Sequence, residues 1–588
     1  MKLFACLKSS GSRRRALFTV VLLSLASVSA VCAVAASAAN TREVAVAAIA
    51  APDRYAAEVA EAVLRRGGNA VDAAVATAFV LAVTYPEAGN LGGGGFITLR
   101  MHGETAFLDF REVAPRAAYR DMYLGADGQP IADASLIGHR AAGVPGTVAG
   151  LWEVHRRYGT RPWRELLQPA IELARDGFVP HPQLRERVAE SLPDYAGRTN
   201  FAAWFGALAA APPAGGDGRF RQPALARTLQ RIAREGAAEF YAGRTAGLLA
   251  AEMRRGGGLI TRADLAAYRP LWREPLQVSW RNYTLVSAPP PSSGGIALVQ
   301  MLAMKDALAA DFAGVAHNSA RYVHLVAEIS KRVFADRAEY LGDPEFTNVP
   351  VSGLLDGDYL RRRATEVRRD AISPLSAVKP GLEESRETTH FSIMDGVGNA
   401  VALTYTLNGS FGNGVVVEGA GFLLNNEMDD FSTKPGIPNL YGVVGGTANE
   451  IAPGKRMLSS MTPTLLLAED RVRMVLGTPG GSTIFTSLFQ TIVNRLDFDM
   501  SAQDAVAASR FHHQLLPPTR IVYSRCCALG DAQVLTGLAE LGYEVEPSSW
   551  EFGDVQLIDV DGSGVVSAGA DPRGRGETRV FGLPTTTR

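Results

Sequence analysis

Residues 386–408 read RETTHFSIMDGVGNAVALTYTLN and predict a β-hairpin. The centre, DGVGN, has the glycines of a turn, and the β-branched and apolar residues on both sides suit strands. A threonine pair, Thr388 and Thr389, opens the first strand. Threonine is a good strand residue, so the pair can be purely structural. The alternative is that Thr388 becomes an N-terminus and acts as a nucleophile.

The chemistry of an N-terminal threonine makes this alternative specific. Cleavage after Glu387 would give Thr388 a free α-amine, whose pKa of about 8 suits a general base for the adjacent hydroxyl. The preceding residues 371–387, AISPLSAVKPGLEESRE, are rich in proline and charge and predict an exposed linker. Further along the hairpin, Thr406 and Asn408 stand two apart and would face the same side of a strand.

The composition indicates a globular protein with ample core. The chain has 588 residues, 47% of them hydrophobic and 20% charged, which allows several domains or one large one. Its formal net charge is −1, so no global field favours nucleic acid or an anionic membrane. The standard signatures of serine hydrolases, phosphate-binding loops and zinc proteases are absent from the sequence.

The N-terminus resembles an export signal. Basic residues at Lys2, Lys8 and Arg13–Arg15 precede an uncharged apolar run, which ends in small residues near position 39. We interpret residues 1–39 as a secretory signal peptide and expect an exported, periplasmic or secreted protein. The run is long for a signal peptide, so an uncleaved membrane anchor is the alternative.

Cysteines and histidines give weaker signals. Cys526 and Cys527 are adjacent, and we expect two free thiols, because only a strained vicinal disulfide could join them. His512 and His513 lack a nearby third ligand, so a structural pair is favoured over a metal site.

The remaining sequence predicts sheets covered by helices. Two Ala-rich helices separated by Gly-Gly-Asn follow Ala56, and a glycine loop at 92–95 leads into a strand. Helical patterns span 144–253 and 296–370. From the hairpin at 388 to about residue 480 we expect mostly strands, followed by a helix at 482–496. The segment 555–573 predicts a further hairpin with a glycine turn.

Several polar groups could bind a zwitterionic amino acid beside a scissile amide. Backbone amides at a helix start suit an oxyanion, acids suit an ammonium group, and an arginine with hydroxyls suits a carboxylate. The candidates are Gly480 and Gly481; Glu427, Asp429 and Asp430; and Arg111, Ser459 and Ser460. Each alone has a structural alternative as a turn, a solvated face or a surface ion pair.

The sequence as a whole resembles the γ-glutamyltranspeptidase family, also called glutathione hydrolases. The motifs are GGNAVDAAVA (67–76), AGNLGGGGF (88–96), LDFRE (108–112), PPPSSGG (289–295), TTHFSIMD (388–395), TYTLN (404–408), LLNNEMDDF (423–431), SSMTPT (459–464) and GTPGGS (477–482). The resemblance covers nearly the whole mature chain.

The resemblance implies an α+β fold, a four-layer αββα sandwich of the N-terminal nucleophile hydrolase type. It also implies a precursor that cuts itself between Glu387 and Thr388. The expected products are a large subunit, 40–387, and a small subunit, 388–588, which remain together as a heterodimer. No metal or organic cofactor is implied.

The resemblance assigns a role to each matched residue. Thr388 is the nucleophile that forms the γ-glutamyl-enzyme, supported by Thr406, and Gly480 and Gly481 form the oxyanion hole. The donor's α-carboxylate is held by Arg111, Ser459 and Ser460. The donor's α-amine is held by Asn408, Glu427 and Asp430. The implied donors are glutathione and other γ-glutamyl compounds, and the implied acceptors are water, amino acids and peptides.

One loop bears on the subtype. STKPGIPNLYGVVGG (432–446) resembles the lid of glutathione-type members, in which Tyr441 closes over the site. Cephalosporin acylases of the same superfamily lack such a lid, and an unspecialised Gly/Pro loop is the structural alternative. Two other functions remain open, an acylase for a different acyl group and an exported binding protein without turnover.

Overall fold

The computed structural model describes residues 45–210, 216–378, 387–434 and 446–583. By its internal contacts the chain divides into a large unit, Val46–Phe581, and a unit of terminal residues, Met1–Ala45 with Gly582–Arg588. The proposed signal segment 1–39 lies outside the described residues. None of the helices within the described ranges is long and apolar enough to cross a bilayer.

The predicted hairpin forms the middle of a seven-stranded sheet. Its strands are β1 (Ala45–Ala51), β2 (Gly94–Met101), β3 (Glu104–Asp109), β4 (Leu271–Arg273), β7 (Glu387–Met394), β8 (Ala400–Asn408) and β16 (Glu577–Leu583). They lie in the order β16-β1-β7-β8-β2-β3-β4. Strands β7 and β8 pair antiparallel from Met394 opposite Ala400 to Thr389 opposite Tyr405, which confirms the hairpin.

A second sheet packs against the first. It contains β5 (Leu276–Trp280), β6 (Tyr283–Ser287), β9 (Thr464–Ala468), β10 (Arg471–Gly477), β14 (Gln556–Val560) and β15 (Val566–Ala570), in the order β15-β14-β10-β9-β6-β5. A buried apolar layer joins Ala48, Ala402 and Met394 of the first sheet to Leu465 and Val475 of the second. A small third sheet contains β11 (Phe511–His512), β12 (Arg520–Tyr523) and β13 (Glu544–Pro547).

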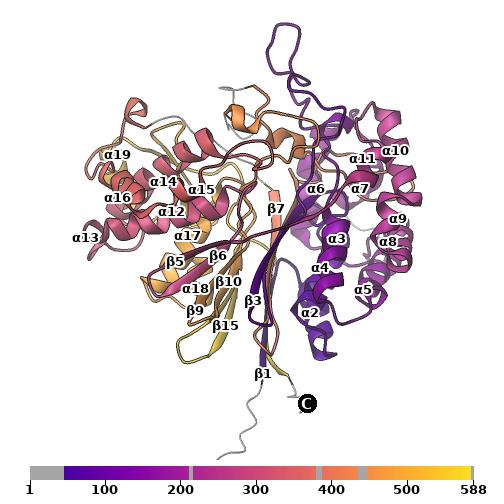
Figure 1. Cartoon of the computed structure of the whole chain (residues 1–588), viewed down its shortest axis with the longest axis horizontal. Coiled ribbons are helices and arrows are strands. Elements are labelled where there is room, and N and C mark those ends of the chain that lie inside the picture. Colours follow the sequence, from indigo (N-terminus) through magenta and orange to yellow (C-terminus); the bar gives the residue numbers. More distant parts are fainter. Residues whose placement is uncertain (1–44, 211–215, 379–386, 435–445, 584–588) are drawn as a thin grey trace, which may run out of the picture. The chain divides into compact units, whose positions relative to one another are not determined.

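Helices cover both outer faces (Figure 1). On the face of the first sheet lie α2 (Arg54–Arg65), α3 (Ala70–Thr84), α4 (Thr147–Tyr158), α5 (Trp163–Asp176), α6 (Pro182–Tyr195), α7 (Phe201–Ala209), α8 (Pro223–Glu235), α9 (Ala237–Tyr241), α10 (Arg244–Gly256) and α11 (Arg262–Ala267). On the other side lie α12 (Gly294–Ala307), α13 (Ala309–Phe312), α14 (Ala320–Tyr340), α15 (Val351–Leu354), α16 (Gly357–Thr365), α17 (Thr483–Leu496), α18 (Ala502–Ala507) and α19 (Ala532–Glu540). Helix, sheet, sheet and helix therefore form the predicted αββα sandwich.

Helix α3 shows why the Ala-rich segment packs centrally. All of its residues are buried, and it contacts β7 and β8 directly. Its start is set by a capping box, in which Asn69 accepts from the Asp72 amide and Asp72 accepts from the Asn69 amide. Small side chains let this helix approach the sheet closely, as the sequence predicts.

The glycine run 92–95 is explained by close backbone approach. A β-carbon on Gly93 would lie 1.9 Å from the Thr406 carbonyl oxygen, and one on Gly95 would lie 2.4 Å from the Thr404 carbonyl oxygen. A β-carbon on Gly94 would lie 2.6 Å from the Phe110 carbonyl oxygen. The run thus seats β2 tightly between β8, which ends in Thr406 and Asn408, and the strand that leads to Arg111.

Two sequence expectations need correction. The expected linker 371–387 is not exposed throughout, because Ser373 and Val378 are buried, and Ser373 bonds to the buried carboxylate of Glu328. Residues 379–386 lie outside the described part. Strands do not dominate between 409 and 463, where the described chain is irregular apart from isolated bridges and the 3₁₀ turns η3 (Glu427–Asp430) and η4 (Thr447–Asn449).

Asparagine side chains replace a strand ladder in this irregular segment. The Asn425 amide donates to the carbonyls of Gly92, at 2.7 Å, and Gly143, at 2.9 Å, while its oxygen accepts from the Gly143 amide at 2.8 Å. These side-chain bonds supplement the isolated bridge between Gly92 and Leu424. They also fix the segment that carries Glu427 and Asp430.

Candidate active site

Thr388 lies at an irregularity in the central hairpin. Glu387 pairs with Asn408 and Thr389 with Tyr405, so β8 contributes one more residue than β7 between these two pairs. Such an irregularity bends the ladder and redirects a side chain. The Thr388 side chain is only 5% exposed, and its Oγ1 lies 3.4 Å from the Thr406 Oγ1, to which it donates. The same Thr406 oxygen accepts from the Asn408 amide at 2.8 Å.

The neighbouring histidine is not a base for Thr388. Burial lowers the pKa of His390 to about 3, so the ring is neutral at physiological pH. Its two nitrogens lie 2.8 Å from the Thr404 Oγ1 and 3.1 Å from the Ser392 Oγ. Both nitrogens are therefore engaged by Thr404 and Ser392.

Gly480 and Gly481 form the turn into α17. Both have positive φ, 124° and 54°, and their carbonyls accept from the amides of Thr483 and Ile484, which starts the helix. The expected helix is confirmed, and Gly480 and Thr388 both belong to the wall of the same pocket.

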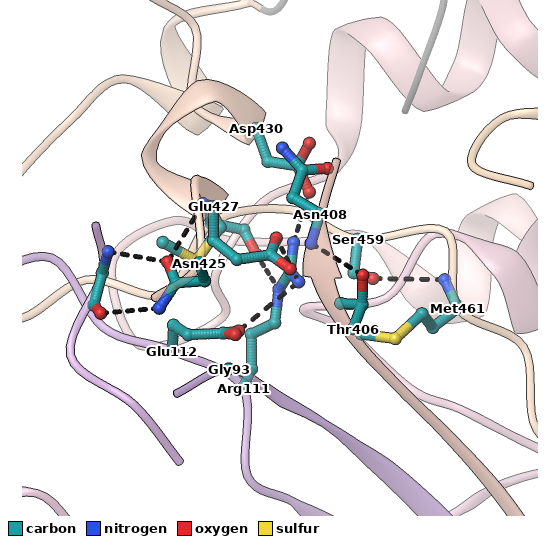
Figure 2. A network of polar contacts seen from close by, with 12 residues as sticks. Gly93, Arg111, Glu112, Thr406, Asn408, Asn425, Glu427, Asp430, Ser459 and Met461 are labelled. Carbon is teal, nitrogen blue, oxygen red and sulfur yellow. Dashed lines mark hydrogen bonds and ion pairs between the residues drawn. The ribbon is translucent and has the colours of Figure 1, made fainter. Parts of the chain in front are cut away.

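Arg111 lies at the centre of an acidic cluster (Figure 2). Its Nη1 lies 2.6 Å from the Glu427 Oε2 and 3.5 Å from the Glu112 Oε2, and its Nη2 donates to Asp430. The residue follows β3 and is 1% exposed, with its three acidic partners also buried. The structure thus brings Arg111, Glu427 and Asp430 together, as the sequence predicts, and adds Glu112.

One guanidinium faces three carboxyl groups, and burial together with these neighbouring charges shifts the pKa values of all four groups. Burial raises the pKa of Glu112 to about 8, and burial also raises those of Glu427 and Asp430, against the lowering effect of Arg111. Burial alone would lower the pKa of Arg111, but Glu427 and Asp430 raise it above its ordinary value. Within the described residues, the oxygens of Glu112 and Glu427 accept no hydrogen bond of ordinary geometry. The cluster holds three carboxyl groups beside the guanidinium of Arg111, and a second cation bound among them would favour their ionised forms.

The two serines lie beside this cluster, on a segment held by the PPPSSGG motif. Ser459 donates its amide to the Pro291 carbonyl at 2.8 Å and accepts at its carbonyl from the Ser293 amide at 2.7 Å. The Ser460 and Ser293 hydroxyls lie 3.1 Å apart. Arg111 donates to the Leu458 carbonyl at 3.3 Å, so the hydroxyl segment and the guanidinium are adjacent.

Some candidates lie elsewhere or were missed. Asp429 accepts a hydrogen bond from the Ser135 hydroxyl at 2.5 Å. Tyr441 lies outside the described residues. Two residues near the site were not predicted, Glu112 and Ser293. Each lies within a family motif, LDFRE or PPPSSGG, but neither motif indicates by its spacing that the residue reaches the site.

The histidine and cysteine expectations have different outcomes. His512 and His513 are buried and bond to Thr486 and to the Arg520 carbonyl, so the structural pair is confirmed. Among the described residues, no group of His, Cys, Asp and Glu could hold a metal ion. The expectation of free thiols is wrong, because Cys526 and Cys527 form a disulfide.

We expect Glu112→Gln to change how stability depends on pH. The folded pKa of about 8 lies above the ordinary 4.5, so ionising Glu112 destabilises the fold as pH rises through this range. Relative to the parent, the glutamine variant should gain unfolding free energy between pH 5 and pH 8. Urea unfolding of the uncut chain, kept uncut by Thr388→Ala in both proteins, measures the difference. A difference independent of pH would contradict the assignment.

The four layers, with a threonine near the start of a central strand, are the architecture of the N-terminal nucleophile hydrolases. A profile of the γ-glutamyltranspeptidase family matches residues 56–581, and the chain belongs to this family. It is 57% identical over 528 residues to the glutathione hydrolase proenzyme of Pseudomonas aeruginosa, covering 90% of this chain and 93% of the relative.

Solved structures agree with this placement. The γ-glutamyltranspeptidase of Pseudomonas nitroreducens, complexed with L-DON, superposes with a TM-score of 0.54 at 55% identity, over 56% of this chain and 97% of that chain. The cephalosporin acylase of Bacillus halodurans superposes with a TM-score of 0.79 at 26% identity, over 91% of this chain and 96% of that chain.

Proposed function

We propose that this enzyme is a self-processing γ-glutamyltransferase and glutathione hydrolase that uses Thr388 as its nucleophile. The observation that carries the substrate class is the cluster of three buried carboxyls around one guanidinium. An incoming ammonium group would pair with Glu427 and Asp430. Arg111, released from part of that pairing, would face the α-carboxylate with Ser459 and Ser460, in the bidentate manner that suits guanidinium. Both charges belong to the α-amino-acid head of a γ-glutamyl group.

Asn408 completes the donor site in this proposal. Its side-chain amide donates to the Asn426 carbonyl at 3.1 Å, which places it between Thr406 and the segment that carries Glu427. Figure 2 shows Asn408 near Asp430 and Ser459, with Thr406 below it. Asn408 thus links the nucleophile to the group that binds the α-amine.

Maturation comes first in the proposed sequence. In the structure, Glu387 and Thr388 are consecutive residues of β7, so this is the uncut form. The Thr388 hydroxyl attacks the Glu387 carbonyl carbon, and the peptide C–N bond breaks to leave an ester and a free α-amine. Water then hydrolyses the ester, which gives subunits 40–387 and 388–588. These share one sheet, because β1, β2, β3 and β4 lie beside β7 and β8.

Two comparisons support processing. The similar Pseudomonas aeruginosa protein is named a proenzyme. The Pseudomonas nitroreducens chain is matched over 97% of its length by only 56% of this chain, as a separate large subunit would be.

Turnover repeats the same chemistry on the donor. The Thr388 oxygen attacks the γ-carbonyl carbon, and its proton passes to the α-amine. Amides at Gly480 and Gly481 stabilise the oxyanion, and the protonated α-amine then donates to the leaving amine. Water or an amino-acid or peptide amine attacks the γ-glutamyl ester and restores the hydroxyl. Export, with residues 1–39 as a signal peptide, would place this reaction outside the cytoplasm.

The likeness to cephalosporin acylase favours one alternative, an acylase for a glutaryl group. A glutaryl group lacks the α-amine, so it offers no cation to pair with Glu427 and Asp430. Rates with a γ-glutamyl-anilide and with its glutaryl counterpart separate the two functions.

The experiment that tests the proposal is the intact mass and N-terminal sequence of the purified protein. We expect two chains, with the smaller beginning at Thr388. A single uncut chain without turnover would favour the non-catalytic binding protein.

We expect Arg111→Lys to weaken donor binding. A lysine retains the charge but has no planar fork for a carboxylate, and its compact ammonium cannot contact Glu427, Asp430 and Glu112 together. The KM for a γ-glutamyl-anilide should rise by about 10-fold or more, the equivalent of about 1.4 kcal/mol. Cleavage after Glu387 should persist, because it needs no donor. An unchanged KM would remove Arg111 from the donor site.

A further inference from the structure

The Cys526–Cys527 disulfide lies on the loop between β12 and α19. Cys526 is exposed and Cys527 is half-buried. Disulfides stabilise proteins mainly by closing a loop in the unfolded chain, and the effect grows with loop length. A bond between consecutive residues closes almost no loop, so stabilisation is a weak reason for this one.

The disulfide is linked to the wall of the active-site pocket. The Cys526 amide donates to the Glu551 Oε2 at 3.0 Å, and the Ser524 hydroxyl donates to the other oxygen of Glu551. Arg573 donates to the Ser524 hydroxyl at 2.6 Å. Glu551 and Arg573 line the same pocket as Thr388. One carboxylate therefore contacts both the disulfide loop and the pocket.

We propose that Cys526–Cys527 is a thiol–disulfide exchange site for small thiols, coupled to the active-site pocket through Glu551. This inference rests on the proposed function, because both the expected donor, glutathione, and the product released from it carry a thiol. These thiols would be released in the pocket that Glu551 lines, one hydrogen bond from the disulfide loop, and exposed disulfides are among the labile ones. An exported protein also meets the oxidising conditions in which such a bond forms.

The exchange has a preferred direction. A small thiolate attacks the exposed Sγ of Cys526, the S–S bond breaks, and its electron pair leaves on the Cys527 sulfur. The Glu551 carboxylate beside Cys526 disfavours a second negative charge there, so Cys527 is the better leaving group. A second small thiolate attacks the small-molecule sulfur of the mixed disulfide and releases the Cys526 thiolate. Two thiols are thereby oxidised to one symmetrical disulfide, and the protein disulfide is reduced to a dithiol.

The test follows one peptide. Arg525 and Arg573 flank a stretch without lysine or arginine, so trypsin releases Cys526 to Arg573 as one fragment. The full protein is incubated without oxygen with cysteinylglycine, quenched in acid and alkylated. The control is the S-methyl dipeptide, which has no thiol. We expect no alkylation before treatment, two alkylated cysteines after it, and no change with the control.

Single variants compare the access of small molecules to the two sulfurs. Cys527→Ser leaves only Cys526, which should form a mixed disulfide with oxidised cysteinylglycine, whereas Cys526→Ser should react at least several-fold more slowly. Alkylation of the untreated parent would overturn the proposal. So would a fragment that stays oxidised in the folded protein under conditions that reduce it in urea.

A kinetic measurement tests the coupling to the pocket. The reduced protein is desalted without oxygen and assayed with a γ-glutamyl-anilide and glycylglycine. We expect at least a twofold change in the acceptor KM, absent from the Cys526→Ser, Cys527→Ser double variant. An unchanged KM in reduced protein would overturn the coupling. Cysteinylglycine has no γ-glutamyl group, so exchange is measured even if the proposed turnover fails.

Discussion

Thr388→Ala is expected to give one uncut chain with no measurable γ-glutamyl transfer. One hydroxyl serves both reactions, first on the Glu387 carbonyl and then on the donor, so removing it stops both. Loss of the nucleophile lowers kcat by roughly 10⁶-fold in a serine protease that also forms an acyl-enzyme. Intact-mass measurement reports the cleavage, and release from a γ-glutamyl-anilide reports the turnover.

Two controls distinguish chemistry from folding in this experiment. Thr388→Ser keeps the hydroxyl and should still mature and turn over, although at a lower rate. Thr389→Ala changes the next residue, which pairs with Tyr405 in the regular ladder, and should mature normally. If Thr388→Ala still separated into two chains, self-cleavage by this hydroxyl would be wrong.

Gly93→Ala is expected to destabilise the protein by about 3 kcal/mol or more and to prevent maturation. The new methyl group would lie 1.9 Å from the Thr406 carbonyl oxygen and 2.8 Å from the Asn90 Oδ1. The backbone of β8 would have to move, and Thr406 accepts the hydrogen bond from Thr388. Packing and the geometry of the nucleophile should therefore fail together.

Thermal unfolding and intact mass measure the two effects of Gly93→Ala. The matched control is Gly353→Ala in α15, where an added β-carbon meets no atom within 4 Å. That variant should keep its stability and its cleavage. Equal behaviour of the two variants would show that the glycine run does not set the strand spacing.

The central hairpin shows how far the sequence predicts this fold. The pattern around DGVGN places both strands correctly, and the expected helix at 482–496 is α17. Both depend on local turn and periodicity rules, which act within a few residues. The expectation of strands is wrong for the described part of 409–463, where the Asn425 side chain instead bonds to the backbone of Gly92 and Gly143, far away in the sequence.

In the candidate site, too, the sequence predicted some residues and the structure added others. The groups around Arg111 were named from family motifs, and the structure brings Glu427 and Asp430 to its guanidinium. Neither composition nor spacing predicts that Glu112 joins them, or that burial raises its pKa to about 8. Desolvation depends on everything packed around a group, so no local pattern predicts it.

The sequence by itself determined the family, the αββα sandwich, the threonine that opens the central strand and the residue types around it. Only the tertiary structure decided that β8 contributes one more residue opposite Thr388, and that Glu551 joins the disulfide loop to the pocket. Hairpins and helices follow from neighbours along the chain. Charge balance, close backbone approach and the orientation of Thr388 arise from segments hundreds of residues apart, which meet only when the sheets and helices pack.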